Sequence, residues 1–258
     1  MLPRRTGVTV LFAVVVLLFV SFFFIPRIPQ PPGYHNFADH RAWLGIPNFA
    51  NVASNLPFAI FGGTGLLFLR TVETKQKFID ARERWPYVFV FLGLFLTAFG
   101  SGYYHWHPFN ATLLWDRLPM TIAFMGIVAA LVSERVSVAV GHYALVPLLL
   151  LGVSSPIQWY LSELRDRGDL RFYAAVQLAA VLALPLFLLL FPARYTRGAD
   201  LWVIVVFYVL AKCLETFDEQ IFAASHIVSG HTLKHIVASL SGYWIYRMLR
   251  LRRPMPVA

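Results

Sequence analysis

The sequence predicts an all-α polytopic membrane protein, a bundle of seven transmembrane helices with one extra N-terminal anchor helix. Its 258 residues are 58% hydrophobic and only 14% charged, with a mean hydropathy of +0.63, so too few charges are available to cover a soluble protein of this size. Apolar stretches of about 20 residues, the length that crosses a bilayer, also recur between short polar clusters.

Eight apolar stretches are expected to span the membrane. The first follows Arg4 and Arg5 and lacks a small-residue cleavage pattern, so it predicts an anchor helix, with a cleaved signal peptide as the alternative. The fifth is short unless it continues beyond Pro156. The expected spans are Val8–Ile25, Asn48–Leu69, Trp85–Trp106, Leu113–Ser133, Val138–Val153, Leu170–Phe191, Leu201–Phe217 and Gly230–Leu249.

Composition divides the chain into three parts. Residues 1–33 are expected to form the anchor helix and a Pro-rich connector, residues 34–250 the seven-helix membrane domain, and residues 251–258 a basic cytoplasmic tail. Cys213 is the only cysteine, which excludes an intramolecular disulfide and a thiolate metal cluster.

The basic residues predict the orientation in the membrane. The net charge of +9 arises from Lys and Arg that flank the apolar stretches, as in the 70–84 loop, and no basic groove for nucleic acid is indicated. With both termini in the cytoplasm, most of these residues fall on the inside, as membrane topology favours. The compact loops and the lack of a eukaryotic sorting tail favour a bacterial inner membrane.

Three histidines are the candidate metal ligands. His231 and His235 are four residues apart on one helical face, so both imidazoles can reach a single metal ion. His105 ends another predicted span and is expected at the same depth. Three neutral imidazoles with one open position are typical of catalytic zinc, whose bound water has a pKa of about 7. Histidines at a wet helix end are the structural alternative.

Asp116 and Ser101 are the candidate catalytic residues. Asp116 starts the span after His105, where a carboxylate needs a compensating partner. It is expected to orient or deprotonate the zinc-bound water, with an ion pair to Arg117 as the alternative. Ser101 precedes His105 by one turn and can donate to a substrate carbonyl, although its glycine neighbours also suit a close helix contact.

Lys212, Glu215 and Asp218 follow one another at intervals of three residues along the seventh predicted span. They are expected to share one helical face, where an ion pair would fix the helix against its neighbours. His107 and His226 are expected to be polar residues at the membrane surface.

The combined spacing of these residues resembles a known family. Ser101-x3-His105, Asp116 eleven residues later, and His231-x3-His235 resemble the signature of the alkaline ceramidase family. That family belongs to a superfamily of seven-helix metal-dependent membrane hydrolases that includes the adiponectin-receptor-like proteins.

The resemblance covers residues 39–249 and implies a function. The three histidines would bind zinc with a water, Asp116 would orient or deprotonate that water, and Ser101 would polarise the scissile carbonyl. The substrate would be ceramide or a related lipid, whose amide is hydrolysed near the non-cytoplasmic face. Alternatives are an adiponectin-receptor-like sensor with weak or no hydrolysis, and a transporter or haem-binding bundle.

Upstream of Ser54 the chain departs from the family, although residues 48–55 resemble its motif ending in Ser-Asn. The family carries a carboxylate cluster resembling a calcium site, whereas this chain offers only Asp39 and Asn48 beside a few other polar groups, and no glutamate. Calcium takes six to eight oxygen ligands, so a site formed by these two residues with backbone carbonyls stays open as an alternative. Because of this departure, the sequence also does not predict which headgroup the lipid substrate carries.

Overall fold

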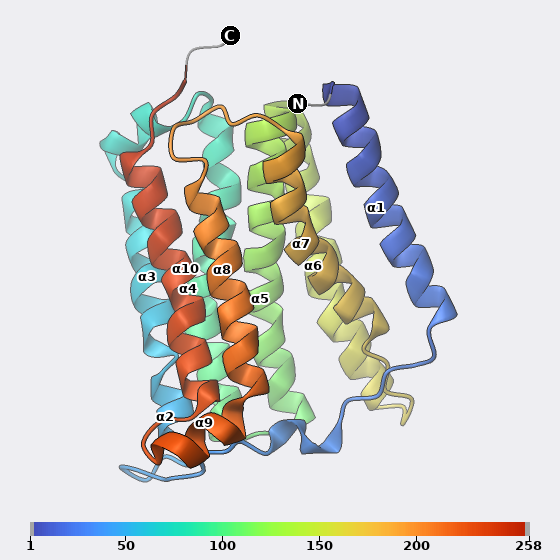
Figure 1. Ribbon diagram of the computed structural model, residues 1–258, viewed down its shortest axis with the longest axis vertical. Helices are drawn as coiled ribbons and strands as arrows, with labels where there is room; N and C mark the ends of the chain where they lie inside the picture. The colour runs from blue at the N-terminus through green and yellow to red at the C-terminus, as the bar shows by residue number, and fades with distance from the viewer. Residues whose placement is uncertain (1–2, 256–258) are drawn as a thin grey trace.

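The computed structural model describes residues 3–255 and is all-helical, without a β-strand in that range (Figure 1). The predicted helical fold class is therefore confirmed. The long helices are α1 (Arg4–Phe24), α3 (Leu56–Phe68), α4 (Arg84–Trp106), α5 (Asn110–Leu131), α6 (Val138–Glu163), α7 (Arg171–Leu190), α8 (Asp200–Thr216) and α10 (Gly230–Leu251).

Shorter helices cap the two ends of the bundle. They are η1 (Pro32–His35), α2 (Phe49–Ala53), η2 (Val72–Lys77), η3 (Ala81–Glu83), the π-helical turn η4 (Val132–Val136) and α9 (Asp218–Ser225). We call the end with α2 and α9 the histidine end. The opposite end, where both described termini lie, is the basic end (Figure 1).

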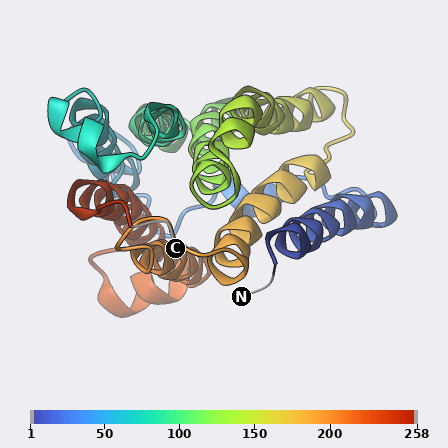
Figure 2. The same ribbon diagram turned by 90° about the horizontal axis from the view of Figure 1, so that it is seen from above.

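Seven long helices form a closed ring, with the remaining one outside it. Contacts connect α3, α4, α5, α6, α7, α8 and α10 in that order, and α10 returns to α3 (Figure 2). Helix α1 packs on the outer face of α7. The connector that follows α1 crosses the histidine end to reach α2, so the 33/34 boundary expected from composition falls within η1.

Each predicted span coincides with helical structure, but two differ in extent. The second is broken at Ser54 and Asn55 into α2 and α3, because Pro57 has no N–H to continue the hydrogen-bond ladder and instead starts a new helix. The fifth continues through Pro156 to Glu163. A proline within a buried or membrane helix is tolerated when neighbouring helices support it.

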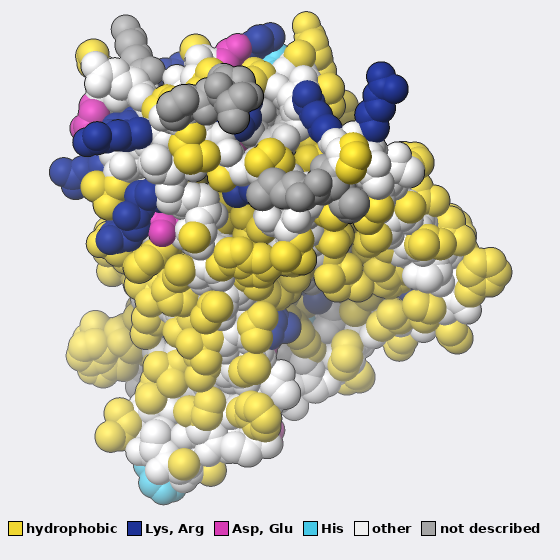
Figure 3. Space-filling view, turned by 45° about the horizontal axis from the view of Figure 1, so that its top comes forward, with side chains coloured by type: hydrophobic (Ala, Val, Ile, Leu, Met, Phe, Trp, Pro, Cys, Tyr) yellow, Lys and Arg dark blue, Asp and Glu magenta, His cyan; other side chains and the backbone are white. Residues whose placement is uncertain are grey.

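Five helical segments, containing α1, α4, α5, α6 and α7, are long and apolar enough to cross a membrane. Helix α3 has 13 residues and α8 has 17, while α10 carries Lys and Arg within its 22 residues. Lys and Arg gather at the basic end above a largely hydrophobic body (Figure 3). The fold is compatible with an integral membrane protein, and the full count of spans stays a prediction.

Candidate metal centre

His105, His231 and His235 meet where the last turn of α4 faces the first two turns of α10. They are 1%, 8% and 3% exposed, and one ring nitrogen from each lies within 4.8 Å of the others. The Nε2 atoms of His105 and His231 are 3.3 Å apart. Two nitrogens bound to one tetrahedral zinc at about 2.0–2.1 Å are separated by about 3.3 Å, so this spacing suits a shared ion.

The start of α10 fixes the position of both histidines that it carries. The Ser229 hydroxyl accepts a hydrogen bond from Thr232 N at 3.1 Å and caps the helix. Asp218 Oδ1 accepts from His231 N at 2.6 Å. A Cβ on Gly230 would lie 2.1 Å from the Leu214 carbonyl oxygen, so only glycine lets α10 begin this close to α8.

The hydrogen bonds of His235 leave one nitrogen free for a metal ion. Its Nδ1 is 2.8 Å from Ser54 Oγ, whose single proton is directed to the Asn51 carbonyl oxygen at 3.0 Å. Ser54 must then accept from His235 Nδ1–H, which leaves a lone pair on Nε2. This buried Nε2 has no hydrogen-bond partner in residues 3–255, nor has His105 Nδ1. A hydrogen bond that fixes the tautomer is typical of metal-binding histidine.

The ligand set suits a divalent transition metal. Three imidazoles without thiolate or carboxylate match zinc and its neighbours better than calcium or magnesium, which prefer oxygen ligands. Phe37 covers the cluster on the connector side, with its ring 4.6 Å from that of His105 and 4.9 Å from that of His231. Nothing in the sequence pattern indicates this contact of Phe37, because an aromatic residue in a connector can pack in many ways.

Ser101 and Asp116 lie close to each other where α4 packs on α5. Ser101 is buried one turn before His105, and Asp116 is partly buried. A Cβ on Gly100 would lie 2.1 Å from the Trp115 carbonyl oxygen, so the glycine provides the close contact between the helices. The two interpretations of this motif are therefore compatible with each other.

Arg117 does not form the ion pair with Asp116 that was the alternative to a catalytic role. Its guanidinium lies 4.1 Å from the centre of the Trp159 ring and 4.7 Å from that of Tyr173, and it donates to Gln30 Oε1 at 2.8 Å. Arg117 therefore ties the connector to the helical ring, and the Asp116 carboxylate lies beside Ser101 instead.

Lys234 is a neighbour of the metal centre that the sequence analysis missed. Its Nζ is 3.0 Å from His231 Nε2 and 2.9 Å from Glu215 Oε1, and Glu215 also pairs with Lys212. The sequence places this lysine inside a predicted span, three residues after a candidate ligand. A charged residue in such a span usually has a functional role, so Lys234 could have been predicted from the sequence.

The expected Lys212–Glu215 ion pair is present, but the prediction for Asp218 was wrong. Helix α8 ends at Thr216, so Asp218 begins α9 and lies off the predicted face. Its carboxylate instead accepts from His231 N and from Ala38 N, which joins the connector to α10.

Asp39 and Asn48, the candidate calcium ligands, have other partners. Both carboxylate oxygens of Asp39 accept from Arg41, at 2.8 and 2.7 Å, and Arg41 also donates to the Ile227 carbonyl oxygen. The hydrogen bond from Arg41 lowers the pKa of Asp39 below its ordinary value. Asn48 Nδ2 donates to the His105 carbonyl oxygen at 2.9 Å. These contacts support a structural role, and the calcium hypothesis gains nothing from them.

Taken together, the site has three imidazoles able to hold a cation, a carboxylate–hydroxyl pair one turn away, and a lysine balanced by a glutamate. His107 and His226 are exposed and stand apart from it. Comparison with known proteins adds no family assignment: no protein-family model matches this chain, and no curated protein matches it.

Proposed function

We propose that this protein is an intramembrane zinc-dependent amidohydrolase that cleaves the amide bond of ceramide or a related lipid. The observation that carries the proposal is the cluster of three buried imidazoles beside the Ser101–Asp116 pair, within a bundle of long apolar helices. When bound to the histidines, zinc supplies a Lewis acid for the amide carbonyl and lowers the pKa of a nearby water.

Asp116 is the proposed general base and acid. Its carboxylate takes a proton from the attacking water and returns it to the leaving nitrogen as the carbon–nitrogen bond breaks. Ser101 lies beside this carboxylate and one turn before His105, so its hydroxyl can donate to the substrate carbonyl in the transition state. Lys234 adds positive charge next to His231, where negative charge develops on the substrate.

The proposed topology has the anchor helix followed by seven spans, with the termini in the cytoplasm and the metal centre near the opposite face. The termini and most basic loops share the basic end, in accord with the preference for positive charge inside. Trp106 and Trp115 are 43% and 57% exposed near the histidine end, where the amide of a lipid substrate would enter at headgroup depth. Reporter fusions at the C-terminus test the orientation.

The test combines metal content with product release. Purified protein should contain about one zinc per chain and release fatty acid from N-acyl sphingosine. Asp116→Ala should retain zinc and lose turnover, whereas His231→Ala should lose both. His107→Ala, an exposed histidine at the end of the same helix as His105, is the matched control and should retain both.

Two results would overturn the enzyme assignment. Zinc without release of fatty acid from several lipid amides and esters would favour the adiponectin-receptor-like sensor. Absence of zinc from wild-type protein, or zinc content unchanged by His231→Ala, would refute the metal centre itself.

A further inference from the structure

A cavity of about 470 Å³ lies at the basic end, far along the helices from the metal centre. Its wall comes from the first turn of α1, the junction between α5 and α6, and the segment that follows α7. Three of its lining residues are arginines, Arg4, Arg135 and Arg194, and none of the described lining residues is acidic.

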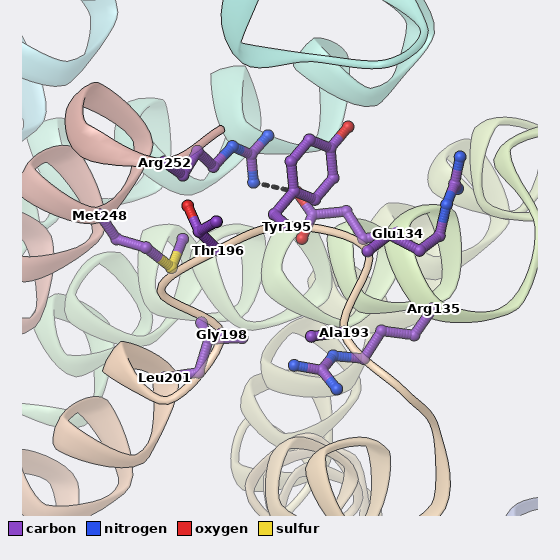
Figure 4. A pocket seen from close by; sticks show the side chains of 10 residues that line it. Glu134, Arg135, Ala193, Tyr195, Thr196, Gly198, Leu201, Met248 and Arg252 are labelled. Carbon is purple, nitrogen blue, oxygen red and sulfur yellow. Dashed lines mark hydrogen bonds and ion pairs between the residues drawn. The ribbon is translucent and has the colours of Figure 1, made fainter. Parts of the chain in front are cut away.

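Arg135 is the most informative of the three because it is buried without a carboxylate partner. It is 9% exposed, and its Nη1 donates to the Phe191 carbonyl oxygen at 2.7 Å. Within residues 3–255 no Asp or Glu lies at ion-pair distance from it. Figure 4 shows its side chain extending below Ala193 toward Gly198. A buried guanidinium held by one backbone carbonyl is costly unless an anion compensates it.

The neighbouring charges leave an excess of positive charge at the cavity. Arg194 is partly neutralised by Glu83, at 3.2 Å, and Glu134 is engaged by Arg252. Arg4 is exposed and has no ion-pair partner among the described side chains. Three arginines therefore line the cavity, and among the described residues Glu83 is the one carboxylate paired with any of them, which favours an anionic ligand.

The remaining walls suit a ligand with an apolar part. Leu190 and Phe191 line the cavity at the end of α7, and Val136 lines it from η4, while α1 and α7 are strongly apolar helices. Ser137, the N-cap of α6, adds a polar side chain to the same wall. The cavity thus combines arginine side chains with apolar ones at the level where the helices end.

We propose that this cavity binds a phosphate group, held by Arg4 and Arg135, and that the phosphate belongs to the headgroup of an anionic lipid seated between α1 and the ring. This site is separate from the metal centre and does not depend on the proposed hydrolase activity. The lipid would fasten α1 to the bundle, because Arg4 belongs to α1 and Arg135 to the ring.

Native mass spectrometry of the full-length protein in detergent tests the proposal, with phosphatidylglycerol and phosphatidylcholine as probes. Wild-type protein should retain phosphatidylglycerol about tenfold more tightly than phosphatidylcholine, and Arg4→Gln and Arg135→Gln should each weaken this binding by about tenfold, as expected for loss of a charge-assisted hydrogen bond. Arg5→Gln removes the same charge from the adjacent exposed residue and should bind as wild type.

Competition with inorganic phosphate identifies the source of the anion. Failure of millimolar phosphate to displace the lipid supports a lipid ligand, whereas displacement supports a free phosphate on the same arginines. Equal binding of phosphatidylglycerol by wild type and Arg4→Gln overturns the proposal. Arg4 is exposed, so its replacement tests the site even if Arg135→Gln does not fold.

Discussion

The two ends of the bundle use buried polar groups differently. At the histidine end, ring nitrogens of His105 and His235 are buried without partners. At the basic end, the buried Glu134 carboxylate accepts a hydrogen bond from Arg252 (Figure 4) and another from Tyr87. The guanidinium of Arg252 also lies 4.0 Å from the centre of the Tyr195 ring.

This difference separates the metal centre, where buried ring nitrogens lack a partner, from the Glu134–Arg252 ion pair, which holds the structure together. An unpartnered buried nitrogen costs free energy unless a metal ion binds it. The Glu134–Arg252 ion pair is largely compensated within the protein by hydrogen bonds and aromatic contacts, although Arg252 Nη2 has no partner among the described residues. Variants at the histidine end should therefore change metal affinity most, and variants at the basic end should change stability most.

The largest effect is expected from Arg252→Met. It leaves Glu134 buried without its cation, so the free energy of unfolding should fall by about 3–5 kcal/mol. Unfolding in mixed detergent measures this change. Arg250→Met, at an exposed position two residues earlier, should be near neutral. Metal content per folded chain should remain that of wild type, and a loss of metal would show that the two ends are coupled.

A large effect on metal affinity is expected from His235→Ala. Removal of one of three ligands should weaken zinc binding by more than about 100-fold, beyond the effect of losing a hydrogen bond to a ligand. Competition with a fluorescent chelator measures it. His226→Ala is the control because that side chain is exposed. Equal affinity of both variants would contradict the assignment of His235.

The sequence predicted the helices well and the long-range contacts only in part. Apolar stretches and the four-residue spacing of His231 and His235 report local structure, which the chain forms wherever the helix lies in the fold. The approach of His105 to them followed from counting helix ends, since an even number of crossings returns the chain to one face. Lys234 was overlooked although its spacing was visible.

Other features could not be predicted, because they depend on how distant segments pack. The contact of Phe37 with the imidazoles requires the connector to cross the histidine end. The pairing of Asp39 with Arg41 and the aromatic surroundings of Arg117 arise in the same way. Helix α9 was missed since its eight residues carry too few apolar side chains for a periodic pattern.

A moderate effect on stability is expected from Gly100→Ala. The added methyl group would clash with the Trp115 backbone, separate α4 from α5 and cost about 1–3 kcal/mol. Turnover should fall as well, because the same contact brings Ser101 to Asp116. Gly102→Ala is the matched control, since a Cβ there meets nothing within 4 Å. Similar stability of the two variants would refute the packing role of Gly100.

A smaller effect on metal affinity is expected from Ser54→Ala, which removes the hydrogen bond that orients His235. Zinc binding should weaken by about tenfold while the fold is retained. Ser239→Ala is a close control: Ser239 is also buried and donates to a carbonyl oxygen three residues earlier, but this hydrogen bond involves no histidine. Equal affinities would mean that Ser54 does not set the tautomer of His235.

The smallest expected effect is on the pH dependence of stability. Two Asp-x-Arg pairs, one at each end of the bundle, allow a comparison. Arg41 lowers the pKa of Asp39, and Arg82 lowers that of Asp80 to about 2, from an ordinary value of 3.8. A carboxylate with a lowered pKa contributes stability above its ordinary value and loses it as the pH falls toward the lowered one. Asp39→Asn and Asp80→Asn should each flatten the loss of stability below pH about 4.

Only Asp39→Asn should also change how zinc is retained as the pH falls. Arg41 joins Asp39 to the carbonyl oxygen of Ile227, just before the helix that carries His231, whereas Asp80 lies at the opposite end. The comparison of each variant with wild type removes the shared effect of histidine protonation. If both aspartate variants change zinc retention equally, the metal centre responds to the stability of the whole bundle, and the functional separation of its ends is wrong.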